Sequence, residues 1–409
     1  MRNPVWAIIF LSILAAACAK PAKAPRSRGV LFKDDIDFLT KHSKVVVLSD
    51  EDGNARVAVN PDLQGRVMTS TAGGPDGPSF GWINRELLAS GVNNVHINAF
   101  GGEDRFWLGP EGGPFSIFFK KGDPFDLDHW FTPPAVNEGS FDVVSREEEA
   151  VRFKKAIRLV NYSDAVFDLV VDREVKLLGG PEVAALGLTV PGGVKMVAFQ
   201  SDNSVTNTGT DPWTRDTGLL SIWVLGMFNP SPATTIVIPF KPGPEAELGP
   251  AVNDAYFGKV PAGRLIVKDG VLFFSGDGAF RSKIGLSPKR VKPFAGSYDA
   301  AERVLTLVHL TLPEKAADYV NSMWEVQENP FAGDVVNSYN DGPASPGAKP
   351  LGPFYELESS SPAAALAPGA SIRHVHTTMH FQGDEKSLDM IARQALGVGI
   401  QEIKEVFHK

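Results

Sequence analysis

Apolar and polar residues alternate along much of the chain, and this pattern predicts β-strands. Within residues 151–159, Val151, Phe153, Ile157 and Leu159 all fall on positions of the same parity. Successive side chains of a strand point to opposite faces, so such a stretch has one buried and one exposed face. Similar alternation or short apolar runs predict further strands at residues 44–48, 56–60, 65–70, 167–177, 265–267, 271–274, 304–312 and 372–381.

Turn and helix patterns complete the prediction. Asp-Gly pairs at residues 52–53 and 269–270 lie between predicted strands and favour tight hairpin turns. Helical spacing of apolar residues is limited to residues 314–324 and to a terminal segment, 388–407, that is interrupted near Gly397. A chain that is strand-rich nearly throughout is typical of an all-β sandwich or barrel.

The first residues are typical of a secretory signal. Arg2 precedes a short apolar run at residues 5–14, and three alanines then lead to Cys18. A cysteine that follows small residues at the end of a signal resembles the lipobox of bacterial lipoproteins. We therefore interpret residues 1–18 as a lipoprotein signal peptide whose Cys18 is lipidated. Ordinary signal-peptidase cleavage is the alternative.

The remainder is expected to form a tether and a single domain. Residues 19–29 are basic and rich in Pro and Ala, which is typical of a flexible tether. Residues 30–409 contain no internal repeat or shift in composition, so we expect one β domain closed by the C-terminal helix. Lipidation would place the secreted chain at a membrane, anchored in the periplasm or at the outer membrane. Cys18 is the sole cysteine, so no intrachain disulfide can form.

Charge and missing motifs argue against several classes of protein. The formal net charge is −8, and no basic cluster lies outside the tether, so nucleic acid is not an expected partner. After the signal, no apolar run reaches the ~18 residues of a membrane helix. The sequence contains no P-loop or H-E-x-x-H motif, which are the usual signals of NTPases and metalloproteases.

The stretch 93–113 is the densest in residues that can bind a ligand. His96, Asp104, Arg105 and Trp107 lie there among paired glycines. Glycine allows close backbone approach, the charged side chains supply directional polar contacts, and tryptophan offers a flat apolar face. This combination suits a polar ligand with apolar faces, such as a sugar. The alternative is a tight loop in which Arg105 pairs with a neighbouring acid and Trp107 is buried.

Two more loops carry aromatic and polar side chains. In the segment DLDHWFTPP, residues 126–134, Trp130 can stack on a sugar face while His129 reaches its hydroxyls. Tyr339 and Asn340 in NSYNDGP offer a similar pairing. We expect these residues to contribute to substrate binding. Alternatively, aromatic residues in such loops close the ends of a sandwich.

Paired carboxylates and paired histidines occur near the end of the chain. Glu356 and Glu358 lie two apart in a predicted strand, so both point to one face, ~7 Å apart. His374 and His376 have the same spacing on the last strand. A carboxylate and a histidine can serve as acid and base near neutral pH, so these four are the candidate catalytic residues. The alternatives are a solvent-facing acidic edge and packed histidines.

No cofactor is expected. An H-x-H pair such as His374 and His376 is a recurrent arrangement at metal sites, but it needs a third ligand. His96, His129 or Asp104 could supply that ligand from the loops. A divalent metal at the pair is therefore the minor alternative.

Three stretches in order resemble the galactose mutarotase-like (aldose 1-epimerase) superfamily: PDLQGRVMTS at 61–70, SVTNTGTDPWT at 204–214 and FYELESSSPAAALAPGASIRHVHTTMHF at 354–381. The resemblance implies a large antiparallel β-supersandwich and a glutamate late in the chain as catalytic base. GGEDRFWLGPEGG, DHWFTPPAVNEGSF and NPFAGDVVNSYNDGP look like an uncharacterised bacterial lipoprotein branch. The N-H-x-Y-F-N-L type segment that carries the catalytic histidine of true epimerases is missing.

Two functional hypotheses follow. The first is a carbohydrate-active lipoprotein that binds a sugar and epimerises or otherwise processes it through a Glu/His pair. The second is a non-catalytic lipoprotein that kept the fold and binds sugar or supports a surface complex. For the first, we expect residues 93–113 and 126–137 to meet the strands of Glu356/Glu358 and His374/His376 at one end of the sandwich.

Overall fold

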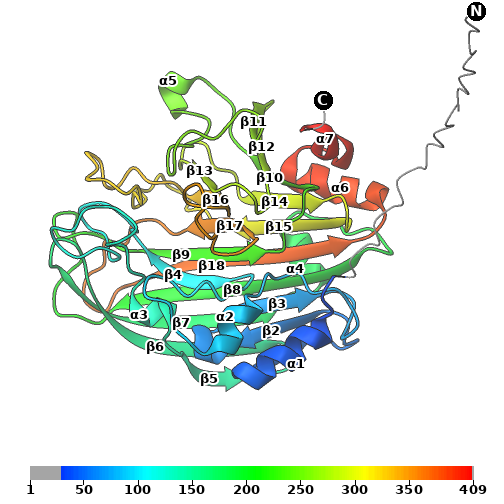
Figure 1. Ribbon diagram of the computed structural model, residues 1–409, viewed down its shortest axis with the longest axis horizontal. Helices are drawn as coiled ribbons and strands as arrows, with labels where there is room; N and C mark the ends of the chain where they lie inside the picture. The colour runs from blue at the N-terminus through cyan, green and yellow to red at the C-terminus, as the bar shows by residue number, and fades with distance from the viewer. Residues whose placement is uncertain (1–28, 408–409) are drawn as a thin grey trace, which may run out of the picture.

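The computed structural model describes residues 29–407, which form three antiparallel sheets (Figure 1). The ten-stranded sheet has the order β11 (Leu265–Lys268), β12 (Val271–Ser275), β10 (Thr234–Pro239), β14 (Phe294–Asp299), β15 (Val304–Leu310), β18 (Ser371–Gln382), β8 (Lys195–Asn207), β7 (Val166–Leu177), β6 (Ala150–Val160) and β5 (Asp142–Arg146). The five-stranded sheet has the order β13 (Ser282–Leu286), β16 (Val336–Asn340), β17 (Tyr355–Ser360), β9 (Ser221–Phe228) and β4 (Arg105–Gly109). The three-stranded sheet contains β1 (Val46–Ser49), β2 (Arg56–Asn60) and β3 (Arg66–Thr71).

The large sheets face one another across an apolar core. Strands β6 and β7 alternate buried and solvent-facing residues, as the sequence pattern predicts. The strands of the five-stranded sheet are instead buried on both faces. Apolar residues of one parity, among them Phe228 and Leu357, pack against Ile236 and Val308 of the ten-stranded sheet. The expected all-β supersandwich is confirmed, and the second face of the five-stranded sheet is free to form a site.

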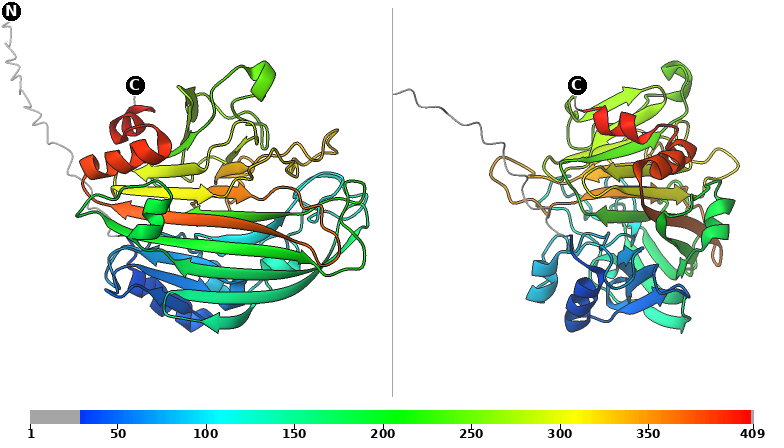
Figure 2. Two further views of the ribbon diagram at one scale, coloured as in Figure 1. Left: turned by 180° about the vertical axis from the view of Figure 1, so that it is seen from behind. Right: turned by 90° about the vertical axis from the view of Figure 1, so that its right-hand side faces the viewer.

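Helices lie at the periphery (Figure 2). They are α1 (Phe32–His42), α2 (Arg85–Ser90), α3 (Pro134–Asn137), α4 (Gly180–Ala185), α5 (Glu245–Leu248), α6 (Glu385–Leu396) and α7 (Ile400–Glu405), with a 3-10 turn, η1 (Pro61–Leu63). The C-terminal helix is confirmed, and it is interrupted as expected: Gly397 adopts φ 74° and ends α6. Leu388 and Ile391 pack it against Phe381 and Leu305 of the ten-stranded sheet.

One helix prediction is wrong, and one longer helix was not predicted. Residues 314–324 are not helical, because this segment pairs with residues 329–333: Tyr319 forms a bridge with Ala332, and the Asn321 amide donates to the Pro330 carbonyl. Tertiary pairing therefore overrides the local periodicity. Conversely, α1 was not expected; its Phe32 and Leu39 pack against the three-stranded sheet.

Both expected hairpins are present. β1 pairs with β2 around residues 52–53, and β11 pairs with β12 around Asp269 and Gly270. Those two residues have φ of 50° and 78°, as the central positions of a type I′ turn require.

The signal peptide, the lipidation of Cys18 and nearly all of the tether lie outside the described residues. In the part that the structure describes, no helix is both long and apolar enough to cross a bilayer.

Candidate functional site

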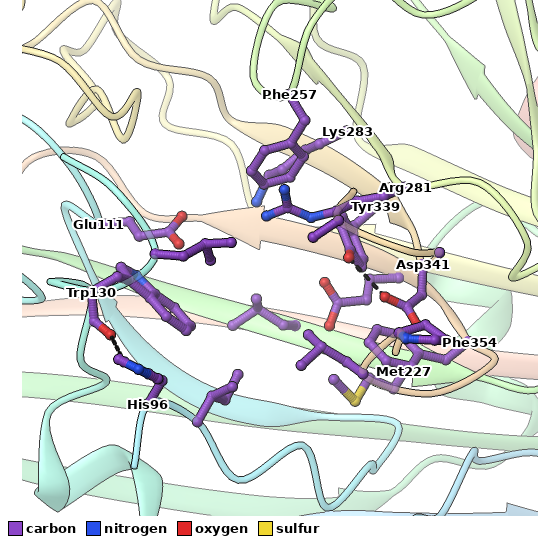
Figure 3. Close-up of a pocket in the computed structure, with 18 of the residues that line it drawn as sticks. His96, Glu111, Trp130, Met227, Phe257, Arg281, Lys283, Tyr339, Asp341 and Phe354 are labelled. Atoms are coloured by element: carbon purple, nitrogen blue, oxygen red, sulfur yellow. Dashed lines mark hydrogen bonds between the residues drawn. The ribbon is translucent and has the colours of Figure 1, made fainter. Parts of the chain in front are cut away.

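A cavity of about 400 Å³ lies on the face of the five-stranded sheet that points away from the ten-stranded sheet (Figure 3). Strand register places its floor. Glu356 of β17 lies opposite Tyr339 of β16 on one side and Met227 of β9 on the other. Trp107 of β4 lies opposite Trp223. Because parity is shared across a ladder, these side chains all project from one face.

Two ion pairs are buried in the floor. The Arg105 guanidinium donates to the Glu356 carboxylate, and both side chains are almost fully buried. The Lys283 ammonium donates to Oε2 of Glu358 at 3.0 Å, and Trp223 Nε1 donates to the same oxygen at 2.9 Å. The charges of Lys283 and Glu358 are tolerable because they are paired, and a protonated Glu356 carboxyl still accepts the hydrogen bond of Arg105 through its carbonyl oxygen.

Burial shifts the protonation of the carboxyl groups. It raises the pKa of Glu356 to about 8; Arg105 opposes the shift and the neighbouring Glu358 adds to it. Burial likewise raises the pKa of Glu111, although Lys283 acts in the opposite direction. Burial alone would lower the pKa of Lys283, but the carboxylates around it, Glu358 above all, leave that pKa raised. The site thus holds a carboxyl group that can exchange a proton near neutral pH.

Aromatic rings form one wall. Trp130 stacks on Phe118, with centroids 5.9 Å apart and ring planes 6° apart, and on Trp324 at 5.7 Å. His96 lies beside it, with Nδ1 2.7 Å from the Trp130 carbonyl oxygen. A carbonyl can only accept, so Nδ1 carries the hydrogen, and Nε2 of the neutral ring carries the lone pair.

The opposite wall combines an aromatic ring with charge. The Arg281 guanidinium lies 3.7 Å from the centroid of Phe257. Tyr339 donates to Asp341 at 2.8 Å, and Asp341 also accepts from the Gly352 amide at 2.8 Å. The loop that runs from Asp341 to Gly352 supplies a further part of the cavity lining, namely Gly342, Ala344, Ala348, Lys349, Pro350 and Leu351.

The structure brings six of the expected site residues to this cavity: His96, Arg105, Trp107, Trp130, Tyr339 and Glu356. Glu358 projects from the same strand face and contacts the lining through Lys283 and Trp223. The loops 93–113 and 126–137 therefore meet β17, but they do so over a face of the five-stranded sheet and without the strand of His374 and His376 that was also expected there.

The two catalytic candidates on β18 lie elsewhere. His374 Nε2 and His376 Nδ1 contact the Ser359 hydroxyl at 2.7 and 2.8 Å. Ser359 has the opposite parity to Glu356 and Glu358, so the histidines lie between the sheets and do not join the carboxylates. Burial lowers the pKa of His374 to about 3 and that of His376 to about 4, so both rings are neutral at neutral pH.

Three expected binding residues also lie away from the cavity. Asp104 points to the sheet interior and pairs with Arg173 at 2.5 Å. The Asn340 side chain ties together residues 277–280, and His129 is exposed and contacts Asp126. Among residues 29–407, no group of three or more His, Cys, Asp or Glu side chains is placed to hold a metal ion. The His374/His376 pair therefore has no third ligand among these residues.

Sequence reasoning missed several lining residues. Arg281 and Lys283 are two apart in the short segment RSKIG, and that spacing on a strand was the available signal for a charged face. Trp324 had been placed in a helix that does not form. Phe257 lies in an irregular segment without periodicity, so nothing local marked it.

The chain belongs to a family described as "Family of unknown function (DUF6786)", which matches residues 30–407. No curated protein matches the chain. The Slr1438 protein of Synechocystis is 12% identical, with a TM-score of 0.49 over 84% of this chain and 96% of that chain.

Two further solved structures are similar. A galactose mutarotase related enzyme from Lactobacillus acidophilus is 11% identical, with a TM-score of 0.45 over 83% of this chain and 98% of that one. A galactose mutarotase-like protein from Lactobacillus casei is 11% identical, with a TM-score of 0.45 over 83% of this chain and 100% of that one.

Proposed function

We propose that the protein binds a carbohydrate in the cavity above the five-stranded sheet and interconverts its anomers by proton transfer. The observation that carries the proposal is the placement of Glu356 and His96 around one aromatic-walled cavity. A volume of about 400 Å³ falls within the range of small-molecule sites, and the mixture of apolar walls with a few polar groups is typical of them.

Binding rests on stacking and on polar contacts. Trp130 and Phe257 offer apolar faces to the ring of a sugar, and Arg281, Lys283 and Asp341 offer donors and acceptors to its hydroxyls. The hydrogen bonds from Arg105 to Glu356 and from Lys283 to Glu358 hold these side chains in place before a ligand arrives, which reduces the entropy lost on binding.

The chemistry needs one acid and one base. Glu356, protonated below a pKa of about 8, donates its proton to the ring oxygen, while Nε2 of His96 accepts the proton of the anomeric hydroxyl. The bond between the anomeric carbon and the ring oxygen then breaks, leaving an open-chain aldehyde. Rotation of the carbonyl and the reverse transfers close the other anomer, so both residues recover their starting states.

A panel of free sugars tests the proposal. Binding is followed by chemical-shift perturbation, and anomeric exchange by NMR exchange spectroscopy. We expect exchange in the wild type and a loss of at least about 100-fold in Glu356→Gln, since general acid catalysis contributes that much. Glu328→Gln, an exposed carboxylate outside the cavity, is the control. Binding without exchange would support the non-catalytic alternative, and absence of binding across the panel would refute the proposal.

We also propose that Cys18 is lipidated and anchors the protein at a bacterial membrane, in the periplasm or at the outer membrane. The support is the short apolar run that ends in small residues before the sole cysteine. Membrane partitioning should be lost in Cys18→Ser. Unchanged partitioning, or an N-terminus mapped elsewhere by mass spectrometry, would contradict this proposal.

A further inference from the structure

A second cavity, of about 330 Å³, lies on a different part of the molecule, where β14, β15 and β18 meet β9 and β17. It is separate from the site above, and the two cavities share no lining residue. Pro78, Phe80, Phe228 and Pro230 make its walls apolar. Thr306, Tyr355 and His380 contribute polar side chains, and each is buried.

The polar side chains form an ordered chain of hydrogen bonds. Nε2 of His380 lies 2.8 Å from Oε2 of Glu103, and Nδ1 lies 2.9 Å from the Thr306 hydroxyl. Glu103 is itself fixed by the backbone amide and the hydroxyl of Ser70. The imidazole is held between Phe80, stacked at 4.4 Å, and Phe228, edge-on at 5.7 Å.

These contacts determine the direction of the hydrogen bonds. An ionised carboxylate only accepts, so Nε2 of His380 carries the hydrogen that faces Glu103. Nδ1 then carries the lone pair, and Thr306 must donate to it. A carboxylate that fixes an imidazole, which in turn accepts from a hydroxyl, is the arrangement that activates serine and threonine nucleophiles.

Tyr355 supplies a donor beside the nucleophile. Its hydroxyl lies 2.7 Å from the Ser297 hydroxyl, and Tyr355 lines the same cavity as Thr306. A tyrosine hydroxyl can stabilise the oxyanion of a tetrahedral intermediate. Nucleophile, base, orienting carboxylate and oxyanion donor are therefore assembled around one cavity, which is the set that acyl transfer requires.

We infer that this second cavity is an acyl-transfer site that hydrolyses small carboxylic esters, with Thr306 as nucleophile, His380 as base and Tyr355 as oxyanion donor. Thr306 Oγ1 bonds to the ester carbonyl carbon while its proton passes to Nδ1 of His380. That proton then goes to the departing alkoxide as the ester C–O bond breaks. Water, deprotonated by the same nitrogen, releases the acid and restores the threonine.

The lining also selects for charge. Asp299 and Glu302 are the charged residues at the rim, and no lysine or arginine is among the lining residues that the structure describes. Esters with a neutral or cationic acyl group are therefore favoured over those that carry a carboxylate.

Hydrolysis of p-nitrophenyl butyrate tests the inference, with peptide mapping by mass spectrometry to locate the butyryl group. We expect the adduct on Thr306 and a loss in kcat/KM of at least about 100-fold in Thr306→Val. Thr306→Ser should retain turnover. Glu103→Gln should lose as much as Thr306→Val, because the amide can donate to Nε2 and force the hydrogen onto Nδ1.

Thr235→Val, a buried threonine of the same sheet outside the cavity, is the matched control and should hydrolyse the ester at the wild-type rate. Equal rates in wild type and Thr306→Val, or an adduct that maps only to lysine or other histidines, would overturn the inference. If Thr306→Val does not fold, peptide mapping of the wild type decides: a butyryl group on Thr306 supports the inference, and its absence from Thr306 overturns it.

Discussion

The two sides of the five-stranded sheet carry the same kind of ion pair in opposite settings. On the outer face, Arg105 pairs with Glu356 beside an open cavity. On the inner side of the sheet, Arg173 pairs with Asp104, and both side chains are completely buried between the sheets. A buried arginine–carboxylate pair therefore does not by itself mark a functional site; the space next to it does.

Both settings leave some buried polar atoms without a hydrogen-bond partner among the described residues, and they differ in what lies beside those atoms. The inner pair is extended by protein groups: Arg173 also donates to Asn203 and to the Gly65 carbonyl. Oδ2 of Asp104 nevertheless has no partner among the described residues, but Asp104 does not line the cavity. In the outer site, Nε of Arg105 and Oε1 of Glu358 have no partner among the described residues, although both atoms are buried. Unused polar capacity beside a cavity is what a ligand can satisfy.

The largest effect is expected from Arg173→Met. It leaves the Asp104 carboxylate buried without its cation, and breaking such a pair costs about 3–5 kcal/mol in the free energy of unfolding. Denaturant unfolding followed by circular dichroism measures the loss. Arg152→Met removes an exposed ion pair with Glu174 and should cost less than about 1 kcal/mol. Equal losses of unfolding free energy in the two variants would show that the buried pair contributes no more to stability than the exposed pair.

Next in size is the pH dependence of anomeric exchange. As general acid, Glu356 must be protonated, so the rate should fall about tenfold per pH unit above its pKa of about 8. The same group affects stability: because its folded pKa lies above 4.5, its stabilising contribution is full below pH 4.5 and is lost as the pH rises to about 8. Glu356→Gln should remove this change in the free energy of unfolding. A rate that stays constant from pH 7 to 10 would exclude Glu356 as the acid.

His376→Ala should lower stability and leave sugar binding unchanged. The ring contacts Ser359 between the sheets. Its removal takes away one of the two histidine contacts of the Ser359 hydroxyl and leaves a cavity in the core, which should cost about 1–3 kcal/mol in the free energy of unfolding. Thermal unfolding and the NMR binding assay are the paired measurements. His129→Ala, which removes an exposed ring, is the control for stability. If His376→Ala loses sugar binding while its stability is unchanged, His376 is a residue of the binding site after all.

Parity explains what the sequence could and could not predict. Glu356 and Glu358 were placed on one face correctly, because alternation within a strand is local. His374 and His376 obey the same rule, but which face of β18 meets β17 depends on how the sheets stack, and no local pattern contains that. The helix expected at 314–324 failed for a related reason: its partner, residues 329–333, is available only in the folded chain.

The candidate site shows the same limit. His96, Arg105 and Trp107 come from a stretch whose composition alone suggested a ligand. Lys283 and Phe257 reach the cavity because β13 pairs with β16 and because an irregular segment crosses above it. Long-range register of this kind follows from the whole chain, so six of the 25 lining residues could be proposed in advance and the remainder could not.

The smallest effect should come from Phe257→Leu, which tests the cavity wall without touching the ion pairs. Leucine keeps most of the apolar volume but loses the flat face, and aromatic contacts contribute about 0.5–1.5 kcal/mol beyond area burial. Sugar affinity should therefore fall about 2–10-fold, with little change in exchange rate at saturation. Phe280→Leu, an exposed ring that stacks on Arg264 outside the cavity, is the matched control and should bind as the wild type does. If both variants bind sugar like the wild type, the ligand does not contact the wall that contains Phe257. The sugar would then contact only the wall that contains Trp130 and His96.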